Sequence, residues 1–288
     1  MFQWKRLPDA DADLTNSADT TETQIGSGVK VPNWARSIKA VRILHRLITL
    51  TTDEEIAGYL RLNNDEETID PLYLPLPIAQ CLTGALGTHH GYEPIVFPLE
   101  LAVTPNDTVR AYSAYDAATT GVHTMVAYLL FSSNPARFHL HAQKGAVQTQ
   151  STSSVTKAAT VSTIATIAGK VSGLLGIWGY LIAGGGITAA QSVTGYVKIQ
   201  SDAAGWVEQN IPLNIQPSGL GSQISPNTKP VVAVHRDLLA EFDLQGVTKL
   251  PWPDIFPINV PQDFNFYGVM DGANTAAPTG RFGLIWRR

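Results

Sequence analysis

The sequence predicts an all-β protein that consists of two consecutive domains of the same kind, each a β-barrel or β-sandwich. First, segment 56–78 recurs as segment 193–215 without a gap, at a constant offset of 137 residues (193 minus 56). Second, short apolar runs alternate with clusters of Gly, Pro, Asn and Asp, which is typical of all-β domains. Third, a chain of 288 residues is long enough for two domains that each bury a core.

The repeat preserves both identity and chemistry. Arg61 is matched by Lys198, and a second block, 94–99, is matched later in the chain by 254–258. A period this long indicates a duplicated domain, because solenoid repeats have periods of about 20–50 residues. The residues that recur identically are Gly58, Tyr59, Asp65, Pro75, Leu76 and Ile78, as Gly195, Tyr196, Asp202, Pro212, Leu213 and Ile215.

Residues 1–33 are expected to be an N-terminal arm, because they are rich in Asp, Thr, Ser and Gly and show no sustained apolar period. Phe2 and Trp4 lie beside Lys5 and Arg6 at its start. An aromatic and basic terminus can anchor at a membrane surface, or it can pack on its own domain as a frayed end. Both interpretations remain open.

Segment 34–50 places four basic residues at near-helical spacing opposite apolar ones. The pattern fits a short basic amphipathic helix, and in part it also fits a strand. Its basic side is either a solvated charged face or a docking face for acidic lipid or protein. The basic residues are Arg36, Lys39, Arg42 and Arg46.

The first barrel is expected over 34–135, a linker over 136–170 and the second barrel over 171–288. Within the linker, 155–169 is rich in Ala, Thr and Ser and predicts an extended spacer or a weak helix. The second barrel carries an insertion at about 219–250, in which 235–242 is the best short-helix candidate. The strands expected are 56–62, 72–76, 95–103, 109–115, 123–131 and, last in the chain, 282–286.

Segment 171–197 has no charged residue and is apolar enough to suggest a membrane-spanning helix. Its many glycines disfavour a helix, at up to about 1 kcal/mol each relative to alanine. The corresponding part of the first copy, 38–50, carries Lys39, Arg42, His45 and Arg46. A buried pair of strands joined by a turn at 184–186 is therefore the better interpretation.

Composition excludes several functions. A net charge of −4 argues against a general nucleic-acid binder, which needs a basic surface. The single cysteine, Cys81, excludes an intramolecular disulfide and a multi-cysteine metal site. The chain also contains neither the phosphate-binding loop motif nor the G-x-S-x-G nucleophile elbow.

The motif His139-Leu140-His141 is the strongest candidate for chemistry. In a strand, positions i and i+2 share a face, so the two imidazoles could bind one metal ion. A tandem-barrel cupin would place a carboxylate soon afterwards, but residues 142–146 contain none. We therefore expect surface histidines in a linker, and predict no catalytic residue, no cofactor, no metal site and no enzymatic activity.

The chain resembles the double jelly-roll major capsid proteins of tailless icosahedral viruses that contain an internal membrane. The resemblance is architectural and covers about residues 35–288. It rests on the duplication, in which Gly58-Tyr59 is matched by Gly195-Tyr196 and Phe97-Pro98 by Phe256-Pro257. It implies two tandem jelly-roll barrels per chain and a homotrimeric, pseudo-hexameric capsomer in the virion shell, made in the host cytoplasm.

The implied partners are neighbouring capsomers, minor capsid proteins and the internal viral membrane, with no direct contact to nucleic acid. The alternatives are a tandem β-sandwich enzyme or lectin, of the bicupin or carbohydrate-binding kind, and a viral spike or receptor-binding protein. The residues expected to contact the membrane or a neighbour are Trp4, Lys5, Arg6, Arg36, Lys39, Arg42 and Arg46.

Overall fold

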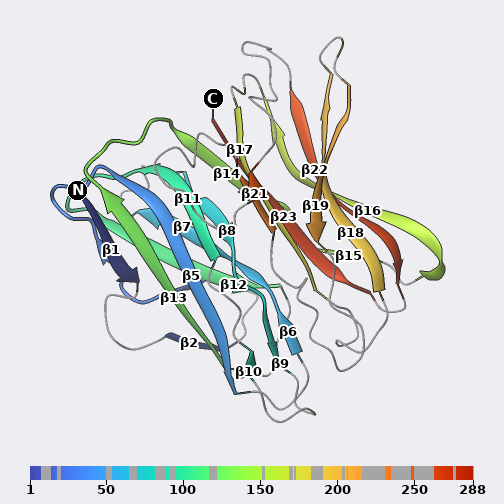
Figure 1. Ribbon diagram of the computed structural model, residues 1–288, viewed down its shortest axis with the longest axis horizontal. Helices are drawn as coiled ribbons and strands as arrows, with labels where there is room; N and C mark the ends of the chain where they lie inside the picture. Colours follow the sequence, from blue (N-terminus) through green and yellow to red (C-terminus); the bar gives the residue numbers. More distant parts are fainter. Residues whose placement is uncertain are drawn as a thin grey trace. The chain divides into compact units, whose positions relative to one another are not determined.

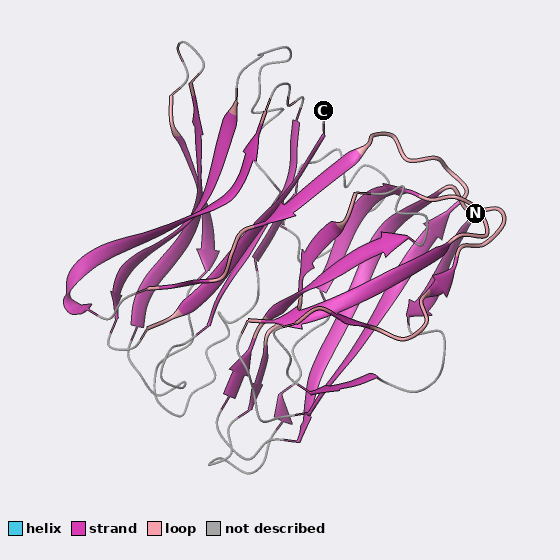
Figure 2. Cartoon of the chain, turned by 180° about the vertical axis from the view of Figure 1, so that it is seen from behind, coloured by secondary structure: helices cyan, strands magenta, loops and turns pink. Residues whose placement is uncertain are grey.

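The computed structural model shows an all-β protein whose described residues fall into two compact units, one up to Ala142 and one from Gln143 onward. Among the described residues all regular structure is strand and none is helical (Figure 2). The predicted all-β class is confirmed. The described residues are 1–7, 14–17, 21–49, 54–64, 70–81, 89–90, 95–116, 122–150, 153–168, 171, 173–182, 191–202, 205, 207–215, 231–234, 248–249, 263–274 and 277–287.

The first unit contains two principal sheets, in the strand orders β1-β13-β5-β11 and β3-β12-β7-β8, with β4 also pairing β12 (Figure 1). Short strands β6, β9 and β10 form a third, small sheet, and β2 extends the pairing of β13. The strands are β1 (Phe2–Leu7), β2 (Leu14–Ser17), β3 (Thr23–Gln24), β4 (Val29–Lys30), β5 (Ser37–Thr49), β6 (Glu54–Ile56), β7 (Gly58–Asn64), β8 (Leu72–Pro75), β9 (Ala79–Cys81), β10 (His89–His90), β11 (Ile95–Ala102), β12 (Thr108–Tyr115) and β13 (Val122–Ser132).

The second unit repeats this arrangement with the sheets β14-β23-β17-β20 and β16-β22-β18-β19 (Figure 1). Strand β15 also pairs β23, and β21 lies parallel beside β20. The strands are β14 (Leu140–Lys144), β15 (Gln148–Thr149), β16 (Ser153–Ile167), β17 (Gly173–Ile182), β18 (Gln191–Ser201), β19 (Gln209–Ile215), β20 (Val231–Val234), β21 (Thr248–Lys249), β22 (Phe264–Asn274) and β23 (Thr279–Arg287). Strand β14 begins in the first unit, which ends at Ala142, and continues into the second.

Both units have the strand order of a jelly roll. If β3 and β4 are counted as one broken strand, and the eight principal strands of each unit are numbered in chain order, the two sheets read 1-8-3-6 and 2-7-4-5 in both units. This interleaving of two Greek keys defines the eight-stranded jelly roll. In the second unit one hydrophobic core draws on both sheets, for example through Ile177 and Leu284 of one and Val197 and Phe266 of the other.

The sequence repeat has a structural counterpart in strand register. Tyr59 pairs with Pro75 between β7 and β8, and Tyr196 pairs with Pro212 between β18 and β19. The same offset of 137 residues therefore holds for both partners of the pair. The duplication preserves a two-strand unit together with its hydrogen-bonding register. The second matched block, 254–258, lies outside the described residues.

The expected arm belongs to the first jelly roll. All six residues of β1 pair antiparallel with β13, and Leu7, Ile25 and Val29 are completely or almost completely buried. Segment 34–50 contains strand β5 rather than a helix, because both neighbours β13 and β11 complete its hydrogen bonds. The arm was predicted from composition alone, and composition cannot show that a strand far along the chain, β13, pairs with residues 2–7.

The expected linker is also strand-forming. Residues 153–167 form β16, so neither the extended spacer nor the linker helix is found there. Ile164, Ala165 and Ile167 of β16 are buried, and the strand pairs with β22. The helix expected in the insertion, 235–242, lies outside the described residues.

Strand β17 accounts for most of the uncharged stretch, and all ten of its residues are buried. A strand is confirmed here, but the expected pairing of two strands across 184–186 is wrong, because β17 pairs β20 and β23 whereas β18 pairs β19 and β22. The turn itself lies outside the described residues. No helix among the described residues is long and apolar enough to cross a membrane.

Candidate functional site

Three of the predicted contact residues lie on one face of the first unit. The register places Trp4, Leu130 and Ala40 in one row across β1, β13 and β5, and Arg6, Tyr128 and Arg42 in the next. Residues directly opposite one another on adjacent strands share a face of the sheet. Trp4 and Arg42 are exposed and Arg6 is half-buried. Trp4, Arg6 and Arg42 are called the aromatic–basic face below.

The remaining predicted contact residues differ in their surroundings. Lys5 is half-buried and donates from Nζ to the carbonyl oxygen of Lys30 at 3.1 Å. Arg36 is exposed and donates to the carbonyl oxygen of Ala35 at 3.1 Å. The side chain of Arg46 lies outside the described residues.

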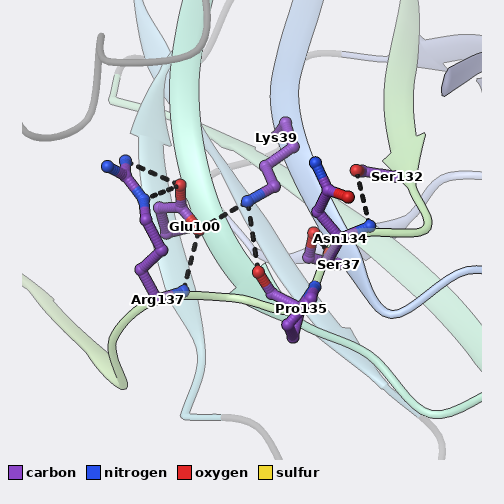
Figure 3. A network of polar contacts seen from close by, with 7 residues as sticks. All are labelled: Ser37, Lys39, Glu100, Ser132, Asn134, Pro135 and Arg137. Carbon is purple, nitrogen blue, oxygen red and sulfur yellow. Dashed lines mark hydrogen bonds and ion pairs between the residues drawn. The ribbon is translucent and has the colours of Figure 1, made fainter. Parts of the chain in front are cut away.

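Lys39 was predicted to be a surface contact, and that prediction is wrong. Its side chain is 1% exposed and its Nζ lies 2.8 Å from Oε2 of Glu100, which is also 1% exposed (Figure 3). The same Nζ donates to the carbonyl oxygen of Pro135 at 3.3 Å. A lysine enters a protein interior at tolerable cost when a carboxylate and further hydrogen bonds compensate its charge, as they do here.

Glu100 is the centre of this buried network. Its Oε1 accepts from Nε of Arg137 at 2.8 Å, and its Oε2 accepts from the backbone N–H of Arg137 at 3.1 Å (Figure 3). Nearby, Ser37 donates to the carbonyl oxygen of Asn134 at 2.7 Å. These bonds fasten segment 133–137, which follows β13, onto strands β5 and β11. We call Lys39, Glu100 and Arg137 the buried charge network.

A second charged cluster ties the N-terminal segment to the other sheet of the first unit. Glu22 accepts from the hydroxyl of Tyr59 at 2.9 Å and lies 2.7 Å from Nε of Arg61. The guanidinium of Arg61 lies 4.1 Å from the ring centre of Tyr112. Burial, followed by the nearby Glu22 carboxylate, raises the pKa of Tyr73, which packs edge-on against Tyr59.

The second unit repeats the cation–π contact of this cluster. Lys198, which matches Arg61 in the repeat, lies 5.1 Å from the ring centre of Tyr267. In both units the cation and the aromatic ring are direct cross-strand partners, Arg61 with Tyr112 and Lys198 with Tyr267. Recurrence in both units indicates that the pair stabilises the jelly roll, at about 0.5–2 kcal/mol for residues that are half-buried, as these are.

His139 and His141 lie on one face, as the i, i+2 spacing predicts, because the intervening Leu140 is buried. Their ring centres are 4.8 Å apart. The structure adds a third residue, Asp70, just before β8. Its Oδ2 lies 2.6 Å from Nδ1 of His141 and 3.7 Å from Nε2 of His139. Asp70, His139 and His141 are called the His–Asp cluster, and all three belong to the first unit.

A surface hollow of about 240 Å³ adjoins the His–Asp cluster. His139 belongs to both features. The hollow is lined by the end of β11 and the residues after it together with the segment that leads into β14, namely Leu101, Ala102, Val103, Thr104, Phe138, His139 and Leu140.

Asp70 was missed from the sequence because no local motif links it to the two histidines. Glu100 was missed because an isolated acidic residue in a strand carries no pattern of its own. The only available signal was its placement in an otherwise apolar run, 95–103, where a buried charge requires a partner.

Comparisons with known proteins give no family. No protein-family model matches the chain, and no curated protein matches it. Among solved structures, N-glycanase F (PNGase F) is similar over 100% of this chain and 99% of its own, at 8% identity and a TM-score of 0.35. At that TM-score the similarity supports no conclusion about activity.

Proposed function

We propose that this protein is a structural subunit of an icosahedral viral capsid, a double jelly-roll major capsid protein that assembles as a trimer. The main support is that one chain contains two jelly rolls with the same strand order. The strand pair β7–β8 of the first and the pair β18–β19 of the second also have the same register. Two similar barrels per chain give six in a trimer. Such a trimer fills a nearly sixfold lattice position while keeping closed threefold symmetry.

The aromatic–basic face gives the proposal a contact surface. An exposed tryptophan beside arginines on one sheet face suits a neighbouring capsomer or an acidic membrane surface, since Trp and Arg are enriched in protein interfaces. A capsid subunit of this kind would also bind minor capsid proteins. Lectins and cupins share the jelly-roll fold, so assembly, rather than fold, distinguishes a capsid subunit from them.

Light scattering coupled to size exclusion tests the proposal. The purified protein is expected to elute as one species of about 93 kDa, three times the 31.0 kDa of one chain. Large apolar interfaces hold such obligate trimers together, so the species should persist on dilution into the nanomolar range. A monomer at all concentrations would contradict the proposal and favour a tandem β-sandwich enzyme or lectin.

A further inference from the structure

We propose that the His–Asp cluster binds a divalent first-row transition-metal ion, with Zn²⁺ as the reference ion. The three donors are Nε2 of His139, Nδ1 of His141 and Oδ2 of Asp70, and all three atoms lie within 4.8 Å of one another. Two imidazoles and one carboxylate are a recurrent ligand set for zinc and for related ions. The site does not depend on the capsid proposal.

The distances fit a metal centre after small side-chain movements. With bonds of about 2.0–2.2 Å, tetrahedral zinc ligands lie about 3.3 Å apart. The Asp70–His139 distance of 3.7 Å is close to this value. The Asp70–His141 distance of 2.6 Å is that of a hydrogen bond, which an ion entering the site would replace by two coordinate bonds. The side chains of His139 and Asp70 are 62% and 51% exposed, so both have room to move.

The backbone holds the two histidines ready for such an ion. Leu140, the first residue of β14, is buried, and the histidines before and after it lie on the other face of the chain. Arg137, two residues before His139, is also held in place, because its backbone N–H and its Nε both donate to Glu100. Leu72, the first residue of β8, is buried and anchors the chain two residues after Asp70. The backbone that carries the three ligands is therefore held in place by neighbouring contacts, while the ligand side chains remain accessible to an ion from solvent.

Ligand type selects the class of ion. Ca²⁺ takes six to eight oxygen ligands and Mg²⁺ prefers oxygen and water, so a set dominated by imidazole favours zinc and its neighbours. Three protein ligands leave a coordination position for water or for a small ligand. His139 also lines the 240 Å³ hollow, so a molecule bound there would lie next to the ion.

Equilibrium dialysis of the full-length chain, prepared without a histidine tag, against micromolar ZnCl₂ tests the proposal. Bound zinc is measured by mass spectrometry. We expect about one ion per chain, retained in millimolar Ca²⁺ and Mg²⁺. His139→Ala, His141→Ala and Asp70→Asn should each weaken binding by at least about tenfold.

Glu208→Gln is the matched control, because it removes an exposed carboxylate of the second unit that is bonded to Gln200, and it should bind like the wild type. His139→Ala is the decisive variant, since its exposed side chain makes folding insensitive to the change. Circular dichroism checks that each variant is folded. Absence of bound zinc in the wild type, or unchanged binding in His139→Ala, would overturn the proposal and leave a structural contact between Asp70 and His141.

Discussion

Replacing Glu100 by glutamine is expected to lower the free energy of unfolding of the first unit by about 3–5 kcal/mol. The substitution keeps the shape of the side chain but removes the only negative charge of the buried charge network. Lys39, 1% exposed, would then retain a buried ammonium group that faces an amide and the carbonyl of Pro135. Removing one partner of a buried pair is costly because the other charge stays uncompensated. Urea unfolding, with linear extrapolation, measures the change.

The double variant Lys39→Met, Glu100→Gln is the matched control. It leaves no buried charge on either strand, so it should recover much of the stability that the single variant loses, since apolar replacements of buried pairs are often neutral. If Glu100→Gln alone lowered the free energy of unfolding by less than about 1 kcal/mol, Lys39 would have to be in contact with water, because solvent-exposed ion pairs contribute about that amount. That result would contradict the burial assigned to the network.

Gly58→Ala is expected to destabilise the first unit by about 2–3 kcal/mol, at the upper end of the usual cost of overpacking. A methyl group on Gly58 would collide with the backbone carbonyl oxygen of Ala114, its neighbour on β12. Because that oxygen belongs to a central strand of the sheet, it cannot move without disturbing the pairing of β7 with β12. Thermal or urea unfolding of the purified variant measures the loss.

The repeat provides a matched comparison in Gly195. There the added methyl group would meet Cδ1 and Cγ1 of the buried Ile215 at 2.7 Å, so the contact is with a side chain, which can rearrange without displacing a strand backbone. Gly195→Ala should therefore cost less than Gly58→Ala, although both glycines occupy the same position of the repeat. If the two substitutions destabilised the protein equally, or if Gly195→Ala destabilised it more, crowding against the backbone of β12 would not explain why glycine is required at position 58.

Strands with alternating or continuous apolar residues could be predicted from the sequence to within a few residues. Predicted 72–76 and 95–103 correspond to β8 (Leu72–Pro75) and β11 (Ile95–Ala102). β16 was missed because Ala, Thr and Ser carry a weak apolar signal, and its strand form depends on pairing with β22. β1 was missed for a similar reason, because its partner β13 lies at the far end of the same domain.

The candidate sites show the same division between local and distant information. The i, i+2 spacing of His139 and His141 is local, and it correctly predicted that both rings share a face. Asp70 comes from a distant loop, so only the folded chain reveals it as their partner. Lys39 was misassigned to the surface because a charged residue is normally exposed, and its counter-ion Glu100 lies on a strand far along the chain.

Cryo-electron microscopy of the purified protein would show directly whether the chain assembles as a trimer of double jelly rolls. We expect particles with threefold symmetry in which each subunit contributes two barrel-sized densities, so that six barrels form a nearly hexagonal outline. Single chains with two barrels, or assemblies without a threefold axis, would contradict the proposed capsid role while leaving the double jelly-roll fold intact.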